Sequence, residues 1–319
     1  MDALAPLPQP PWKIAVVGAG AVGCYYGGRL AQGGNEVHFL LRRDLDHVRQ
    51  HGLDIRSHLG DFHLQPVHAH GSTREIGPCD VVLIALKTTG NAALETLLPP
   101  LLGDRTLLVT LQNGLGNEEF LAARWGAGRV LGGVCFTCIN RTAPGLIEHT
   151  AQGTVALGEF QRPVLQRTET LAAEFRRCGI DCRTEPLDWT RWKKLVWNVP
   201  FNGLAIAAGG MNTAEILGSP ALAHLVTALM EEIIAIAAVL GHDLPESLAA
   251  DMLASTRGMG PYRPSSMIDY LEGREVEVEA LWGEPWRRAL AAGAPAGRLD
   301  MLYHFISHAV ACRKNARAD

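Results

Sequence analysis

The chain has 319 residues, of which 47% are hydrophobic, and its 29 basic and 33 acidic residues give a formal net charge of −4. This length accommodates one large domain or two ordinary ones, each with a substantial core. The near-balanced charge argues against a nucleic-acid-binding surface or an acidic tail, so small soluble ligands are the expected partners. Residues 1–11 are proline-rich and lack the long apolar core of a signal peptide, and we expect them to form a disordered extension.

The stretch Lys13–Arg43 has the order strand, glycine-rich turn, helix and strand. Such a unit is typical of dinucleotide binding, whereas a glycine-rich turn without a ligand is the alternative. The first glycine would make a tight turn, the second would admit a pyrophosphate to the backbone, and the third would let helix and strand pack closely. The pyrophosphate would lie at the start of the helix. We therefore predict cofactor binding by Gly18, Gly20, Ala21, Val22 and Gly23.

The end of the second strand indicates which dinucleotide would bind. A carboxylate there would bind a ribose 2′-hydroxyl, but here Leu41 is followed by Arg42 and Arg43. Two guanidinium groups suit a 2′-phosphate, so the sequence favours NADP(H) over NAD(H). Asp44 is close enough in sequence to offer a competing carboxylate.

Two further apolar strands, residues 80–86 and 106–111, are each followed by polar residues. Ligands of an open parallel sheet bind at the carboxyl ends of its strands. Lys87, and Asn113 in Gln112-Asn113-Gly114, are therefore candidates for binding cofactor or substrate. Ordinary turn chemistry is the alternative for both residues.

The chain changes character at residues 185–188, because the first part mixes strands and helices while the remainder is nearly all helical. We predict an α/β fold: a Rossmann-type dinucleotide-binding domain over residues 12–186, then an all-α substrate or dimerisation domain over residues 187–319. In the first part we expect helices at 44–51, 91–98 and 164–178, a short hairpin at 53–67, a longer hairpin around 143–145, and an extended piece at 180–184.

The first helix of the second part carries a polar stripe. Lys194, Asn198 and Asn202 are spaced i, i+4, i+8 and therefore lie on one helix face, among tryptophans and aliphatic residues. Buried polar groups need partners, which favours a cleft with a polar substrate over pairing with backbone carbonyls. Pro200 lies within the stripe and is expected to kink the helix.

Other features favour structural interpretations. Seven cysteines, an odd number without secretory signals, indicate reduced thiols in a cytoplasm. Cys135 and Cys138 would point to opposite faces of a strand, so we predict no metal site. Glu231-Glu232 interrupts the apolar run 225–240, which favours a buried helix over a membrane span. The acidic run 272–279, taken alone, is typical of a solvated helix start.

Together these motifs resemble the ketopantoate reductase (2-dehydropantoate 2-reductase) family, in the same order from Lys13 to about Leu302. The resemblance is carried by Gly18–Gly23, Arg42, Lys87, Gln112-Asn113-Gly114, Pro144-Gly145 with His149-Thr150, the WxKLxxNxxxN pattern of Trp192–Asn202, Ser265-Ser266-Met267, and Gly273-Arg274-x-x-Glu277.

The resemblance implies NADPH-dependent reduction of 2-dehydropantoate to pantoate, which is used for coenzyme A. Hydride would reach the C2 carbonyl, with Lys194 as general acid and Glu277 as the second catalytic residue. The resemblance also implies that Lys87 and Asn113 lie beside the cofactor. Substrate binding is implied for Asn198, Asn202, Ser266 and Asn113.

The chain departs from the family pattern in three places. The family often has glutamine at Gly90 and tends to have Asn-Gly at Trp282-Gly283, and the Ser266–Glu277 segment is one residue short. These departures leave open a reductase of another 2-oxo acid or an opine-type dehydrogenase. A non-catalytic NADP(H) sensor is a further alternative, against which Lys194 and Glu277 argue. Broad apolar helix faces in the second part also allow a homodimer.

Overall fold

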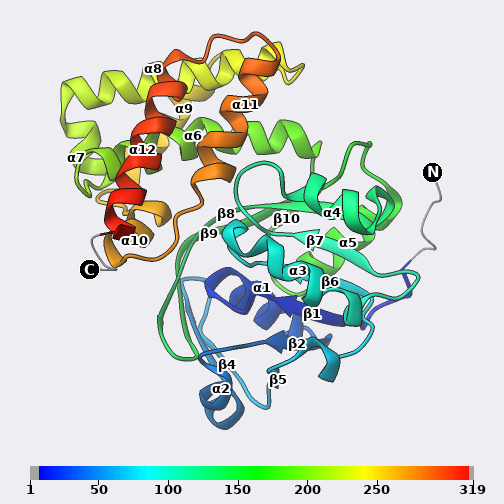
Figure 1. The fold of residues 1–319 in the computed structure, drawn as a ribbon. Helices are drawn as coiled ribbons and strands as arrows, with labels where there is room; N and C mark the ends of the chain where they lie inside the picture. The colour runs from blue at the N-terminus through cyan, green and yellow to red at the C-terminus, as the bar shows by residue number, and fades with distance from the viewer. Residues whose placement is uncertain (1–6, 316–319) are drawn as a thin grey trace. The chain divides into compact units, whose positions relative to one another are not determined.

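The computed structural model describes residues 7–315. Its described residues form two compact units, one comprising residues 7–113 with 117–187 and the other residues 114–116 with 188–315. The first unit has a sheet with helices and the second is helical (Figure 1). The predicted fold class, a Rossmann-type α/β domain followed by an all-α domain, is confirmed.

The described residues of the first unit form ten strands in a single sheet. Neighbouring strands in the order β5-β2-β1-β6-β7-β8 are all parallel, and β8 then pairs with β9 as an antiparallel hairpin. β3 and β10 both pair with β9 in parallel, and β4 pairs with β3. The strands are β1 (Lys13–Val17), β2 (Glu36–Leu40), β3 (Leu53–Ser57), β4 (Phe62–Leu64), β5 (His68–His70), β6 (Val81–Ile84), β7 (Leu107–Thr110), β8 (Val130–Ala143), β9 (Leu146–Glu159) and β10 (Cys182–Thr184).

The helices at residues 21–32, 45–51 and 166–177 agree with the sequence prediction, the helix at 117–125 was not predicted, and residues 91–98 differ from the prediction. There, a 3₁₀ turn, η2 (Thr88–Ala93), is followed by only four α-helical residues, because Pro99 and Pro100 cannot donate the amide bonds that would continue the helix. The α-helices are α1 (Ala21–Gln32), α2 (Leu45–His51), α3 (Leu94–Leu97), α4 (Asn117–Trp125) and α5 (Gln166–Arg177); the other 3₁₀ turns are η1 (Thr73–Glu75), η3 (Pro99–Leu101) and η4 (Ala127–Arg129).

Part of the expected disordered extension contacts the first unit. Residues 1–6 lie outside the described residues, but Leu7 packs against the core of the sheet. The Pro8 carbonyl accepts a hydrogen bond from Nε1 of Trp12 at 2.7 Å. A buried indole N–H needs an acceptor, and Pro8 supplies it. The expectation of disorder is therefore wrong for residues 7–11.

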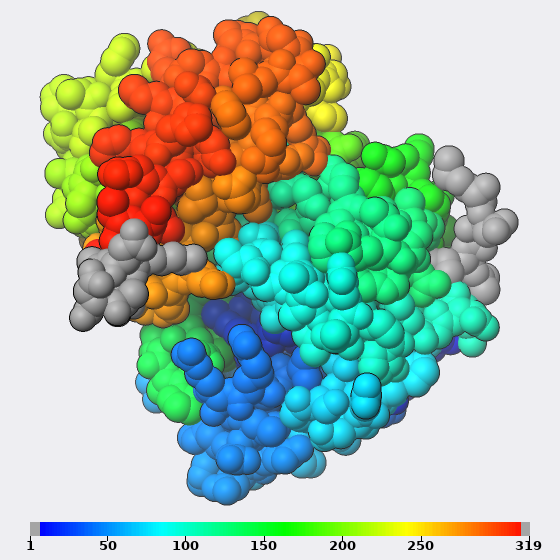
Figure 2. All heavy atoms as spheres, in the orientation of Figure 1, coloured from blue at the N-terminus to red at the C-terminus, as the bar shows by residue number. Residues whose placement is uncertain are grey.

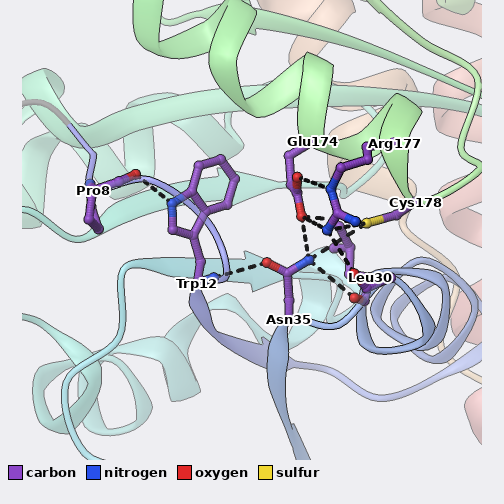
Figure 3. Close-up of polar contacts among 8 residues, drawn as sticks. Pro8, Trp12, Leu30, Asn35, Glu174, Arg177 and Cys178 are labelled. Carbon is purple, nitrogen blue, oxygen red and sulfur yellow. Dashed lines mark hydrogen bonds and ion pairs between the residues drawn. The ribbon is translucent and has the colours of Figure 1, made fainter.

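A buried polar network joins α5 to the loop between α1 and β2 (Figure 3). The Asn35 side chain accepts from the Trp12 amide at 3.0 Å and donates to the Glu174 carboxylate at 2.7 Å. Arg177 donates to the same carboxylate at 2.6 and 2.7 Å. Burial alone would raise the pKa of Glu174, but hydrogen bonds from Arg177 and Asn35 outweigh it, and the pKa lies below its ordinary value.

Glu174→Gln is expected to destabilise the first unit by about 2 kcal/mol at pH 7, because hydrogen bonds to a charged group are lost. A lowered carboxyl pKa gives stability that is complete above the unfolded value of 4.5 and is lost as pH falls through the folded value. Thermal unfolding at pH 7 and pH 4 should therefore show a smaller acid-induced loss for the variant than for the wild type. Glu95→Gln, at an exposed ion pair with Arg124, is the control. Equal pH dependence of wild type and Glu174→Gln would contradict the account.

The second unit is a set of helices around its own apolar core. The predicted helix carrying the polar stripe is α6 (Leu187–Ala207), which continues past Pro200; a kink at Pro200 stays a prediction. The other elements are α7 (Thr213–Gly218), α8 (Pro220–Val239), α9 (Leu248–Gly258), α10 (Ser265–Glu272), the π-helical turn η5 (Glu279–Gly283), α11 (Glu284–Ala291) and α12 (Gly297–Asn315).

Helix α8 is long and apolar enough to cross a membrane by length and composition, with a mean hydropathy of 1.8. This is weak evidence for a span, because core helices of soluble proteins pass the same test. Glu232 is buried and accepts from the backbone amides of Arg298 and Leu299, at 3.2 and 2.8 Å. Its carboxylate thus lies at the N-terminus of α12, where the helix dipole favours negative charge. Helix α8 is a packed helix within its unit, as predicted.

Candidate functional site

Two glycines of the turn after β1 are required by the fold itself. Gly18 has φ +101°, and a Cβ there would lie 2.3 Å from the amide nitrogen of Leu86. A Cβ at Gly23 would lie 2.3 Å from the carbonyl oxygen of Gly18. The first glycine therefore allows a left-handed turn and the third a close approach between helix and turn, as the sequence pattern predicts.

Gly20 is different, because nothing in the protein requires a glycine there. Its φ is −86°, which other residues adopt, and a Cβ would meet no atom within 4 Å. It is the N-cap of α1, makes no side-chain capping bond, and the first turn of the helix has no acidic residue. The first amides of the helix, from Ala21 and Val22, have no helical acceptors. This open, uncapped helix start fits the pyrophosphate of a dinucleotide.

The carboxyl ends of three strands lie level with this turn. Ala85 donates its amide to the Val17 carbonyl, and Leu111 donates to the Ile84 carbonyl, both at 2.8 Å. Lys87 and Asn113 follow two residues after these bonds, so their backbones leave the sheet at the edge that carries Gly18. The first unit thus brings together the glycine turn, Lys87 and Asn113.

A chain of amide side chains that sequence reasoning missed supports the backbone at Asn113. Gln112 donates to Asn91 at 2.7 Å, Asn91 donates to Asn117 at 3.1 Å, and Asn117 donates to the Asn113 carbonyl at 3.0 Å. The available signal was Asn117, four residues after Asn113 at a helix start. The neighbouring departure at Gly90 leaves room, because a Cβ there would meet no atom within 4 Å.

The end of β2 leaves two arginines available to a ligand. Arg42 and Arg43 are exposed and, within residues 7–315, neither has a hydrogen bond or ion pair. Asp44, the competing carboxylate, is buried and lies 2.7 Å from the guanidinium of Arg141. The arrangement therefore offers positive charge, and not a free carboxylate, to the group bound at this strand end.

In the second unit, the three residues of the polar stripe on α6 have different surroundings. Lys194 is half-buried. Asn202 is 2% exposed, donates to the Asn198 carbonyl at 3.1 Å and accepts from the Ser266 amide at 3.0 Å. Asn202 is therefore paired with backbone groups, the alternative to a cleft that holds a polar substrate. One N–H of its amide group remains for a ligand.

Asn198 and Ser266 retain unused polar groups. Both residues are buried, and neither side chain makes a hydrogen bond within the part of the chain that the structure describes. Ser266 lies in the first turn of α10, where the amide of Ser266 is bonded to Asn202. Neither side chain has a fully buried polar atom left without a partner in the described part of the chain, so these polar groups remain accessible to water or a ligand.

Glu277 stands apart from the other acids of its run. Glu272, Glu275 and Glu279 are exposed, as expected of a solvated segment, whereas Glu277 is only 8% exposed. It lies between α10 and η5. The interpretation as a solvated helix start is therefore wrong for Glu277, because its neighbours Val276 and Ala280 are core residues and carry it inward.

The second unit thus holds Lys194, Asn198 and Asn202 on one helix, with Ser266 bonded to Asn202 through its backbone and Glu277 following the helix of Ser266. Within residues 7–315 no group of three histidine, cysteine or acidic side chains could hold a metal ion.

Known proteins share this architecture and these motifs. Residues 14–162 match the model of the ketopantoate reductase PanE/ApbA family, and residues 187–310 match the model of its C-terminal domain. A 2-dehydropantoate 2-reductase of Nostoc sp. is 40% identical over 298 residues, covering 92% of this chain and 93% of the relative.

Solved structures agree. The 2-dehydropantoate 2-reductase of Geobacter metallireducens has a TM-score of 0.91 at 44% identity, covering 93% of this chain and 99% of that one. The enzyme of Methylococcus capsulatus has a TM-score of 0.87 at 34% identity, covering 94% and 97%. The chain therefore belongs to the ketopantoate reductase PanE/ApbA family and is an oxidoreductase.

Proposed function

We propose that this chain reduces 2-dehydropantoate to pantoate with NADPH. One observation carries the proposal: one unit carries a lysine, an unpaired amide, an unpaired serine and a buried carboxylate on α6, α10 and the segment before η5. A 2-oxo acid with a hydroxyl group needs a proton donor, a carboxylate partner and a hydroxyl partner, and these residue types provide all three.

Bound NADPH supplies the hydride that C2 of the substrate accepts. As negative charge develops on the carbonyl oxygen, the ammonium group of Lys194 stabilises it and delivers a proton. The Asn198 side chain lies one helical turn away on the same face and would hydrogen-bond to the lysine and hold it in line once the substrate is bound.

The remaining residues select the substrate. Glu277 accepts a hydrogen bond from the substrate hydroxyl, and the spare N–H of Asn202 donates to the same group. Ser266 donates its hydroxyl to the substrate carboxylate. Lys87 and Asn113 bind the cofactor, and Asn113 also binds the substrate. The glycine turn binds the pyrophosphate through Gly18, Gly20, Ala21, Val22 and Gly23.

The transferred hydrogen gives a direct test. With NADPH that carries deuterium at both C4 positions of the nicotinamide, pantoate formed by the enzyme should carry one deuterium at C2, detected by mass spectrometry and NMR. Pantoate without deuterium at C2, or no pantoate at all, would contradict the proposal.

The preference for NADP(H) over NAD(H) rests on Arg42. Arg42→Ala is expected to raise the Kd of NADPH about 10-fold or more while leaving the Kd of NADH nearly unchanged, because a charged hydrogen bond to the 2′-phosphate is lost. Fluorescence titration of both nucleotides measures this. Arg105→Ala is the control, since Arg105 is exposed and precedes β7 at its amino end. Equal weakening of both nucleotides by Arg42→Ala would refute the phosphate contact.

The proposal places the enzyme in a reducing cytoplasm, supported by seven free cysteines, six of them buried. Homodimer formation stays a prediction. Helix α12, red in Figure 2, exposes Met301 and Phe305 on the surface while its other face packs in the core.

A further inference from the structure

The π-helical turn η5 is hydrogen-bonded to two other segments of the second unit. One carries Glu277, and the other directly follows Asn113. The Ala280 carbonyl accepts from the Leu115 amide at 3.0 Å, and a Cβ at Gly114 would lie 2.3 Å from that carbonyl oxygen. The Leu281 amide donates to the Glu277 carbonyl at 3.1 Å. The turn therefore fixes the backbone of Glu277 and the residues that follow Asn113.

Trp282 joins the same turn to α6. Its side chain is 0% exposed, and Nε1 donates to the Val199 carbonyl at 3.0 Å. Val199 directly follows Asn198 and lies three residues before Asn202. On the same helix, a Cβ at Gly203 would lie 3.0 Å from Nε1 of Trp282 and 2.7 Å from Cδ2 of Leu302. The indole is therefore closely confined against the part of α6 that carries both asparagines.

The bond from Trp282 reaches α6 next to Pro200, where the helix is weakened. Pro200 has no amide hydrogen, so the helix lacks one of its own bonds within the polar stripe. The missing bond is the one that would reach the Val196 carbonyl, one turn earlier, and the external donor at Val199 restrains the backbone next to Pro200. Since η5 also holds Glu277, a single side chain sets the spacing between the Glu277 backbone and that of Asn198.

We propose that Trp282 is a positioning residue for the 2-oxo acid site, holding Glu277 and the asparagines of α6 at the separation that a hydroxyl-bearing substrate requires. This inference rests on the proposed function. Trp282, where the chain departs from the family pattern, then sets the distance between Glu277 and the asparagines of α6 from within the core. Trp282 itself does not contact the substrate.

The test is steady-state kinetics of Trp282→Phe with two substrates, ketopantoate and 2-oxoisovalerate, which lacks the hydroxymethyl group. Phenylalanine keeps an aromatic ring and removes the N–H. For ketopantoate, kcat/KM should fall about 10- to 100-fold, since displacements near 1 Å have effects of this size. For 2-oxoisovalerate kcat/KM should fall clearly less, because Glu277 has no hydroxyl to bind there and only the effect that passes through Asn198 to Lys194 is common to both substrates.

Trp12→Phe is the matched control. Trp12 is also 0% exposed and donates its indole N–H to a backbone carbonyl, that of Pro8. A purely structural role would give both variants similar losses in Tm and no change in the ratio of kcat/KM between the two substrates. Equal ratios in Trp282→Phe, Trp12→Phe and the wild type would overturn the inference.

Gly203→Ala provides a second variant, which keeps the indole but presses on Nε1 and Leu302. It should lower the substrate ratio in the same direction as Trp282→Phe, and an unchanged ratio in a folded Gly203→Ala protein would count against the inference. If the wild type reduces no 2-oxo acid, the proposed function fails and the inference with it. If the wild type is active and Trp282→Phe matches Trp12→Phe, only the positioning role fails.

Discussion

Replacing Lys194 with alanine is expected to lower kcat for ketopantoate reduction about 10³-fold. General acid catalysis contributes about 10²- to 10⁴-fold, and the ammonium group also stabilises the charge that develops on the oxygen. The Kd of NADPH should change less than about twofold, because Lys194 belongs to the helical unit and not to the glycine turn. Stopped-flow single turnover and nucleotide titration measure the two quantities separately.

Lys193→Ala is the control for charge and helix propensity. Lys193 is also half-buried on α6, but its ammonium group lies 4.9 Å from the centre of the Trp189 ring. This variant should keep turnover within about threefold of the wild type, an effect comparable to a weak cation–π contact. Near-normal turnover in Lys194→Ala, or equal losses in both variants, would refute the role of Lys194 as general acid.

Replacing Glu277 with glutamine is expected to lower kcat/KM for ketopantoate about 100-fold, with the larger part in KM. The variant keeps the size of the side chain but removes the charge that accepts the substrate hydroxyl, and charged hydrogen bonds are the stronger ones. With 2-oxoisovalerate the loss should be much smaller, since that substrate has no hydroxyl to bind.

Glu275→Gln tests whether loss of any negative charge in this segment lowers kcat/KM, or only loss of the charge at Glu277. Glu275 lies two residues away and is exposed, so its replacement should change kcat/KM less than about twofold. If Glu277→Gln affects both substrates equally, Glu277 serves general charge or packing and not recognition of the hydroxyl.

The candidate cofactor-binding residues of the first unit could be identified from sequence because their signals are local. The turn requires glycine at Gly18, and the close contact between helix and turn requires glycine at Gly23. The protein itself does not require glycine at Gly20, whose backbone is open to a ligand. The spacing of the three glycines in the sequence already indicates this arrangement. Lys87 and Asn113 each follow a continuous apolar strand. This local pattern is enough to predict that both lie at the carboxyl edge of the sheet. The sequence does not reveal that the Asp44 carboxylate after β2 is paired, because its partner Arg141 is 97 residues away.

The candidate substrate-binding residues of the second unit could be identified only in part because their contacts are long-range. The stripe on α6 follows from helical periodicity, but the bond between Asn202 and Ser266 spans 64 residues and cannot be inferred from either segment. Burial of Glu277 depends on how the chain turns after α10, and a run of alternating acids does not reveal it. The bond from Trp282 to Val199, which spans 83 residues, is likewise visible only in the fold.

The most direct test of the account is steady-state NADPH oxidation by the wild type with ketopantoate, pyruvate and 2-oxoisovalerate. A kcat/KM for ketopantoate at least about 100-fold above that for either other acid is expected, since only ketopantoate offers a hydroxyl to Glu277 and Asn202. Preference for 2-oxoisovalerate or pyruvate would identify a reductase of another 2-oxo acid. Tight NADPH binding without turnover of any of the three would contradict the proposed reaction and revive the hypothesis of an NADP(H) sensor.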